Sequence, residues 1–334
     1  MLSTTIRDYL SRPNPIFQLL PWYGRGTITS TPRKEAEIWD PIEGMEAWED
    51  FNLDQVNLVF GSLLDKKFNL PEYPPVLPVH LTIRNERAFE SVVVAYNCII
   101  VNAALKVACE HLKLKQVAWL SGSYVSPSPE KIIPDWAGIC NESYGRSVLP
   151  GDSKYAQQEF SWTPTEDHYE KTDDTSSEAS SDANSSAIAT ERALTQVNHY
   201  AKIYKSRYCY LISPKQALLV RRRKDEQLPA SESLAKNRPL RQKPVAMPSQ
   251  SQRSESEPRS PSPARSDAYV EDTEPDTNMQ YLQLCAVPWG IPEEEGISLN
   301  LALWAMHMIS AVENDVRSSY PALSDDPALK IFSA

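Results

Sequence analysis

Several features that mark common protein classes are missing from this sequence. It has 10 glycines in 334 residues, and its five cysteines contain no CxxC pair. Its five histidines form no HxH or HExxH pattern. These absences argue against a zinc site. Because the cysteines are scattered and most lie in apolar runs, we expect free thiols in a reducing compartment rather than a disulfide framework.

The sequence also lacks a recognisable secretory leader and a long apolar run. Near the N-terminus, Arg7, Asp8 and Pro13 interrupt any apolar segment. The longest charge-free apolar stretches, 91–105 and 296–312, are shorter than the roughly 18–20 residues that a membrane-spanning helix requires. We therefore expect an intracellular protein of the nucleus or cytoplasm that is neither secreted nor bound to a membrane.

Charge is unevenly distributed along the chain. The net charge of -10 is unlike that of most nucleic-acid binders, but it conceals an acidic segment at 164–186 and a basic one at 221–265. Two segments, 164–187 and 225–277, are polar and rich in serine, and their few apolar groups cannot form a core. We predict that both are disordered insertions. The Ser-Pro sites at Ser260 and Ser262 suit regulated binding of protein partners.

Hydrophobic periodicity predicts one mixed sheet flanked by helices, an α/β (α+β) fold. A helix over 85–113 is expected to bury a stripe that includes Phe89, Val93, Ala103 and Val107. Helices are also predicted at 51–67, 188–206 and 298–315. Strands are predicted at 115–122, 130–140, 145–156, 207–213, 216–223 and 279–289, with a hairpin between 207–213 and 216–223 and a kink or bulge at Pro150 and Gly151.

Three domains or segments follow from this pattern. Residues 1–83 are expected to form an N-terminal arm or small helical subdomain, 84–316 the core, and 317–334 a C-terminal tail.

Two acidic motifs fall in successive predicted strands. Asp135 follows Pro134 in one strand, and Asp152 and Lys154 lie two residues apart in the next, so that both project from one face. An antiparallel neighbour brings Asp135 beside them. Two close carboxylates favour a cation, and Mg²⁺ or Mn²⁺ takes oxygen ligands. Lys154 is then placed to orient water or to stabilise negative charge in the transition state.

The strings PDWAGI and LPGDSK resemble the two catalytic strands of the PD-(D/E)XK nuclease superfamily, in the same order and spacing. Gln196 and Tyr200 resemble the QxxxY motif of its RecB-like branch. The run from Pro134 to Trp304 also resembles a group of fungal proteins with no established function. This resemblance implies a restriction-endonuclease-like core, Mg²⁺-dependent cleavage of DNA or RNA, and the following roles. Metal ligands are Asp135, Asp152 and Glu86, with Glu90 ranked second, and Lys154, Gln196 and Tyr200 complete the catalytic set.

Other interpretations remain open at each position. The two aspartates can be turn and strand-end residues, and Glu86 a first-turn acid favoured by the helix dipole. Lys154 can be a solvated lysine, and Gln196 and Tyr200 packing residues. The basic run from Arg221 to Lys224 can be a solvated strand exit, a set of phosphate contacts or half of a nuclear signal. The protein as a whole can instead be an inactive relative that acts as a regulated protein-interaction or nucleic-acid-binding module.

Overall fold

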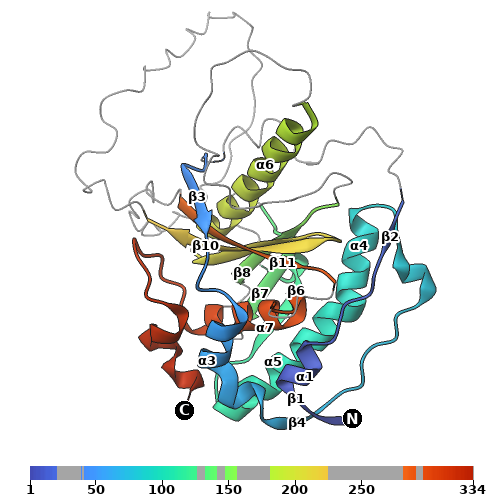
Figure 1. Ribbon diagram of the computed structural model, residues 1–334, viewed down its shortest axis with the longest axis vertical. Coiled ribbons are helices and arrows are strands. Elements are labelled where there is room, and N and C mark those ends of the chain that lie inside the picture. Colours follow the sequence, from blue (N-terminus) through green and yellow to red (C-terminus); the bar gives the residue numbers. More distant parts are fainter. Residues whose placement is uncertain are drawn as a thin grey trace, which may run out of the picture. The chain divides into compact units, whose positions relative to one another are not determined.

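The described part of the chain forms a mixed α/β fold. The computed structural model describes residues 1–20, 39, 41–125, 132–140, 147–155, 181–224, 281–290 and 296–333. All of them belong to one unit made of Met1–Asp225 and Met279–Ala334. Within these residues, six α-helices accompany a seven-stranded mixed sheet and two small two-stranded sheets (Figure 1). The prediction of a mixed α/β fold with one large sheet is confirmed.

The large sheet has the strand order β3–β11–β10–β9–β8–β7–β6. These strands are β3 (Gly44–Ala47), β11 (Tyr281–Pro288), β10 (Gln216–Arg223), β9 (Tyr208–Ile212), β8 (Ser147–Ser153), β7 (Trp136–Cys140) and β6 (Val117–Ser121). Neighbours are antiparallel except for the parallel pairs β3–β11 and β8–β9. The six strands predicted from the sequence are all present, and β9 and β10 form the expected hairpin.

The bulge in this sheet lies at a different place from the one predicted. Pro150 and Gly151 pair in register with Ala137 and Trp136, and the register shifts between Gly138 and Ile139 instead. Position 151 requires glycine for a steric reason, because a Cβ atom there would lie 2.2 Å from the Tyr210 ring. Gly151 thus lets the Tyr210 ring pack directly against the backbone of β8, and it does not bend the strand.

Helices cover both faces of the sheet (Figure 1). On one face lies α6 (Ser181–Ile203), and on the other lie α7 (Leu299–Val312) and α5 (Ile99–Leu112). Side chains of β9 alternate between these two layers, with Tyr208 and Tyr210 in the α7 core and Cys209 and Leu211 in the α6 core. Because strand side chains alternate with a period of two, a continuous apolar run such as YCYLI fits a strand covered on both faces.

The long predicted helix at 85–113 is present, but its buried face changes partway along. It consists of α4 (Glu86–Val92), a π-helical segment η2 (Val93–Cys98) and α5. The π turn adds a residue and rotates the following face. As a result Ala104 and Ala108 are fully buried, whereas Ala103 and Val107, which were expected inside, are only partly buried.

A buried amide cluster holds the π segment. Asn97 donates to Asn14 (2.9 Å) and to Asn300 (2.8 Å), and so joins the N-terminal segment to α7. By length and composition the helix Glu86–Leu112 could cross a membrane, and 61% of its most apolar window is buried inside the protein.

The N-terminal residues join the core sheet as well as packing beside it. The pair β1 (Leu2–Thr5) and β4 (Lys67–Leu70) is antiparallel, and β2 (Gln18–Leu19) pairs in parallel with β5 (Thr82–Ile83). The helices are α1 (Ile6–Leu10) and α3 (Leu53–Leu64), with a 3₁₀ turn η1 (Pro78–Leu81) between β4 and β5. Strand β3 then extends the large sheet, so the region expected as an arm or subdomain supplies one of its edges.

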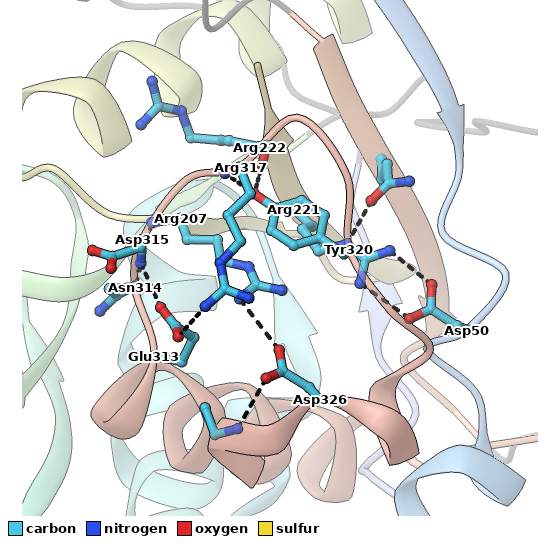
Figure 2. Close-up of polar contacts among 12 residues, drawn as sticks. Asp50, Arg207, Arg221, Arg222, Glu313, Asn314, Asp315, Arg317, Tyr320 and Asp326 are labelled. Atoms are coloured by element: carbon cyan, nitrogen blue, oxygen red, sulfur yellow. Dashed lines mark hydrogen bonds and ion pairs between the residues drawn. The ribbon is translucent and has the colours of Figure 1, made fainter. Parts of the chain in front are cut away.

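The C-terminal segment is held against the sheet by Arg207, which directly precedes β9, and by arginines of β10 (Figure 2). The Tyr320 ring lies 3.8 Å from the Arg207 guanidinium and 4.7 Å from that of Arg221. The Tyr320 hydroxyl donates to the Arg222 carbonyl (2.5 Å). The 3₁₀ turns η5 (Leu323–Asp325) and η6 (Pro327–Phe332) follow, and Phe332 is fully buried. The residues expected as a tail are therefore packed into the fold.

The arginines at the end of β10, which belong to the basic run Arg221–Lys224, are engaged in contacts within the fold. Arg221 and Arg222 are 3% and 1% exposed, and Arg221 makes two hydrogen bonds to the Asp50 carboxylate. Arg223 pairs with Glu46 at 3.0 Å. The interpretation of this run as a solvated strand exit is wrong for Arg221 and Arg222, and so is a role for these two in phosphate contacts. Their guanidinium groups are used inside the fold.

One of the two predicted disordered insertions overlaps a helix. Helix α6 begins at Ser181, so the prediction for 181–187 is wrong. Extending an existing helix requires no new nucleus, which lets α6 continue beyond the boundary that composition indicated. Residues 164–180 and 225–277 lie outside the described residues.

Candidate metal centre

Two glutamates of helix α4 face the ends of the central strands. Asn85 begins this helix, and its side chain accepts a hydrogen bond from the Ala88 backbone N–H (2.8 Å). Glu86 is the first helical residue and Glu90 lies one turn later, on the same side of the helix. The Tyr155 N–H donates to the Glu86 carboxylate (3.3 Å). This bond ties the start of α4 to the residues that follow β8.

Asp135 lies directly before β7, between the ends of β6 and β8. Its carboxylate accepts a hydrogen bond from the Ser153 N–H (2.8 Å), and its backbone carbonyl accepts one from the Gly122 N–H (2.7 Å). Gly122 begins the 3₁₀ turn η3 (Gly122–Tyr124). A Cβ atom at Gly122 would lie 1.6 Å from the Pro134 carbonyl oxygen, so only glycine fits against this strand start.

The carboxylates of Glu86, Glu90 and Asp135 form one cluster. Each offers an oxygen atom, and these atoms all lie within 4.8 Å of one another. All three residues are partly exposed. Glu86 faces Asp135 as predicted, whereas the lower rank given to Glu90 is wrong, because Glu90 faces Asp135 as well. The four-residue spacing of the two glutamates was the signal in the sequence that identifies Glu90.

Asp152 and Lys154 form a buried ion pair beside this cluster. Asp152 lies in β8 and Lys154 directly follows its last residue; the two side chains contact each other, as their spacing predicted, and are 3% and 6% exposed. Asp135 lies near this pair, since its charge raises the pKa of both Asp152 and Lys154 and its carboxylate accepts a hydrogen bond from the Ser153 N–H between them. Asp135, Asp152 and Lys154 thus converge. Within the described part of the chain, the three-carboxylate cluster does not include Asp152, which pairs with Lys154 instead.

Gln196 and Tyr200 lie on α6 and contact each other. The Gln196 side-chain amide donates to the Tyr200 hydroxyl (2.6 Å), and both residues are buried. Tyr200 belongs to the core between α6 and the sheet. Gly151 faces Tyr210 in the opposite core, so the next residue, Asp152, points to the α6 side. The QxxxY pair and the ion pair therefore occupy the same side of the sheet.

Burial, together with neighbouring carboxylates, raises the pKa values of the acids in this site. Burial raises the pKa of Glu86, and the charge of Asp135 adds to this while Lys154 opposes it. Burial and the charges of Asp135 and Glu86 raise the pKa of Glu90 from 4.5 to about 7. Burial also raises the pKa of Asp152 well above its ordinary value, and Asp135 adds to the effect. Burial opposes the charge of Lys154, but the surrounding carboxylates outweigh it and raise its pKa.

A cleft of about 520 Å³ opens beside two of the clustered acids. Glu90 and Asp135 line it together with Arg87 and the ends of β6 and β7. The remaining lining residues are Ser91, Val94, Ser121, Ser123, Ile133, Pro134 and Trp136. A volume of this size holds a small-molecule ligand or one unit of a polymer. The acids therefore lie at the wall of a space that a substrate can enter.

Comparisons with protein-family models, with curated proteins and with solved structures gave no match for this chain.

Proposed function

We propose that this protein is a Mg²⁺- or Mn²⁺-dependent hydrolase of nucleic-acid phosphodiester bonds. The observation that carries the proposal is the cluster of Glu86, Glu90 and Asp135 at the wall of a cleft, with the Asp152–Lys154 pair directly behind it. The resemblance of PDWAGI and LPGDSK to the PD-(D/E)XK nucleases supports the same assignment. In that case the sheet and α4 represent the core of a restriction-endonuclease-like fold.

The residues present fit a hard divalent cation. Mg²⁺ prefers oxygen ligands and is commonly held by one or more carboxylates together with substrate phosphates. Burial and the charge of Asp135 raise the pKa values of Glu86 and Glu90, and a bound cation would offset both effects because it favours the ionised carboxylates. When bound, Mg²⁺ would polarise a phosphoryl oxygen and neutralise charge that develops in the transition state.

The protein's own groups would have distinct roles. Glu86, Glu90 and Asp135 would hold the cation, and the Ser153 N–H would fix the Asp135 carboxylate. Asp152 keeps Lys154 oriented through their ion pair. Lys154 would supply positive charge beside the reacting phosphate, and Gln196 with Tyr200 would support the α6 side of the pair.

A second candidate function is a binding module without catalysis. The side chains of Asp152 and Lys154 are 3% and 6% exposed, which is also what a purely structural ion pair would show. In this alternative the cleft binds a protein or nucleic acid, and the acidic cluster carries no metal.

Metal-dependent melting separates the two functions. Melting temperatures would be measured with Mg²⁺, Mn²⁺ or EDTA for the wild type, Asp135→Asn, and Glu110→Gln as an exposed acidic control on α5. The hydrolase proposal predicts a metal-dependent increase that Asp135→Asn abolishes and Glu110→Gln retains. Absence of any increase in the wild type would favour the binding module.

Cleavage of labelled DNA and RNA tests the chemistry. Removing Lys154 alone leaves a buried carboxyl group without its partner and endangers folding. The double variant Asp152→Asn/Lys154→Met removes both charges at similar volume. We expect it to fold, to keep a metal-dependent melting shift through the other three acids, and to lose cleavage. Cleavage at the wild-type rate by this variant would rule out the proposed role of the ion pair.

A further inference from the structure

Two adjoining clefts run along the helix that carries Glu86 and Glu90. The first is the cleft of about 520 Å³ at the acidic cluster. The second has a volume of about 540 Å³ and follows η2 and α5 as far as Lys106. Val94 and Ser121 line both clefts. Together they form one groove, called here the helix groove, which leads from Glu90 and Asp135 to Lys106.

Large apolar side chains on the walls of the helix groove are open to solvent. Tyr124 is 68% exposed, and Val94, Ile99 and Ile133 are 48%, 46% and 45% exposed. The first two aliphatic residues come from the π segment and the turn after it, where the face of the helix rotates. Single exposed apolar residues are common, but a group of them along one groove beside a polar site indicates a binding surface.

The edge of the sheet in this groove is closed to an added strand at its centre. Strand β6 is the edge strand, and the Asn102 side chain bonds to both backbone groups of Trp119. The Trp119 N–H donates to Asn102 (2.7 Å), and the Asn102 amide donates to the Trp119 carbonyl (2.8 Å). An extended peptide therefore cannot pair with β6 here. The exposed apolar side chains and the charges of the groove are therefore the features that a ligand can use in place of strand pairing.

We propose that the helix groove binds an unpaired strand of nucleic acid that leads into the acidic cluster. This inference rests on the proposed function and specifies its substrate as single-stranded. Bases would stack on the Tyr124 ring and lie over Val94 and Ile99, as bases do on exposed aromatic side chains. Arg87 at one end of the groove and Lys106 at the other would contact phosphates. Paired bases are stacked inside a duplex and cannot contact the Tyr124 ring, Val94 and Ile99 in this way.

The length of the groove agrees with this occupant. Sixteen residues separate Glu90 from Lys106, which corresponds to about 24 Å along the helix axis. That length accommodates at least about four nucleotides, the lower end of the range for single-strand-binding folds. The groove is continuous with the acids, so a strand bound along it would place a phosphate at Asp135.

Binding can be measured apart from cleavage by fluorescence anisotropy. The probes are a labelled oligothymidylate of about twelve nucleotides and a duplex of the same length, in buffer with Ca²⁺, which also takes carboxylate ligands. The variants are Tyr124→Ala and Lys106→Glu. Their matched controls are Leu58→Ala, an exposed apolar residue on α3, and Lys330→Glu, an exposed lysine in η6.

We expect the single strand to bind at least about tenfold more tightly than the duplex. Tyr124→Ala should weaken single-strand binding by about 5- to 100-fold, the range for loss of one stacked base. Lys106→Glu should weaken it and lower its dependence on salt. Both controls should bind like the wild type.

Several results would overturn the proposal. These are binding of the duplex as tightly as the single strand, or Tyr124→Ala binding within about twofold of the wild type. The outcomes also separate this inference from the proposed function. Single-strand binding that depends on Tyr124, without cleavage in Mg²⁺, would support the groove and refute the hydrolase. Cleavage that is insensitive to Tyr124→Ala would support the hydrolase and refute the groove.

Discussion

Glu90 provides the sharpest test of the acidic cluster, because its protonation links pH, stability and metal binding. Its pKa is raised from 4.5 to about 7 by burial and by the charges of Asp135 and Glu86. Between these two pH values the folded protein keeps a proton that the unfolded chain has lost. Without metal, stability therefore falls as pH rises from about 4.5 to about 7 and is constant above that window.

The size of this effect follows from the shift and the exposure of the side chain. A change in pKa from 4.5 to about 7 corresponds to about 3 kcal/mol. Glu90 is only partly buried, so screening by solvent reduces this to about 1–2 kcal/mol. Glu90→Gln keeps the shape and removes the ionisation. We expect it to raise the free energy of unfolding by about 1–2 kcal/mol at pH 8 and by almost nothing at pH 4.5.

Metal should reverse the order of stability of the wild type and Glu90→Gln at pH 8. At pH 8 the wild type gains stability from Mg²⁺ by mass action, and Glu90→Gln should gain less because it lacks one ligand. Urea denaturation at pH 4.5, 6 and 8, with Mg²⁺ or EDTA, measures both effects, with Glu110→Gln as control. A variant whose stability changes equally at all three pH values would refute the electrostatic reasoning. Equal gains from Mg²⁺ in both proteins would exclude Glu90 as a ligand.

Two further predictions concern the packing that positions the site and the C-terminus. Gly122→Ala should lower the free energy of unfolding by at least about 2 kcal/mol and weaken the metal-dependent melting shift, because its Cβ would lie 1.6 Å from the Pro134 carbonyl beside Asp135. Gly61→Ala is the matched control, and with no neighbour within 4 Å in helix α3 it should stabilise by about 1 kcal/mol; a neutral Gly122→Ala would contradict the proposed close approach. Tyr320→Phe should cost about 1 kcal/mol for its hydrogen bonds, whereas Tyr320→Ala should cost about 3 kcal/mol because it also removes both guanidinium contacts. Urea denaturation measures both, and equal losses would show that the contacts with Arg207 and Arg221 contribute little.

Local pattern was sufficient for the secondary structure near the site and for one pair of side chains. The period of two along a strand put Asp152 and Lys154 on one face, and they form an ion pair in the structure. The hairpin of β9 and β10 followed from two apolar runs joined by a short turn. These features depend on residues within a few positions of one another, so the sequence contains the information directly.

The phase of the long helix and the membership of the acidic cluster needed the tertiary structure. The π segment is stabilised by Asn97, whose partners Asn14 and Asn300 are distant in sequence. A stripe drawn at regular helical spacing therefore misplaced Ala103 and Val107. Glu90 joins Glu86 and Asp135 because folding brings α4 close to the residue that precedes β7, whereas periodicity alone ranked Glu90 second.

The sequence by itself indicated the sheet's central strands, their flanking helices and the common direction of Asp152 and Lys154. Only the tertiary structure decided that Glu90 belongs to the cluster, that β3 forms the edge beside β11, and that Arg221 is buried against Asp50. The physical reason is the range of the interactions. Side-chain alternation and helix periodicity are set by neighbouring residues, whereas burial of a charge or pairing at a sheet edge depends on partners that the chain brings together only when it folds.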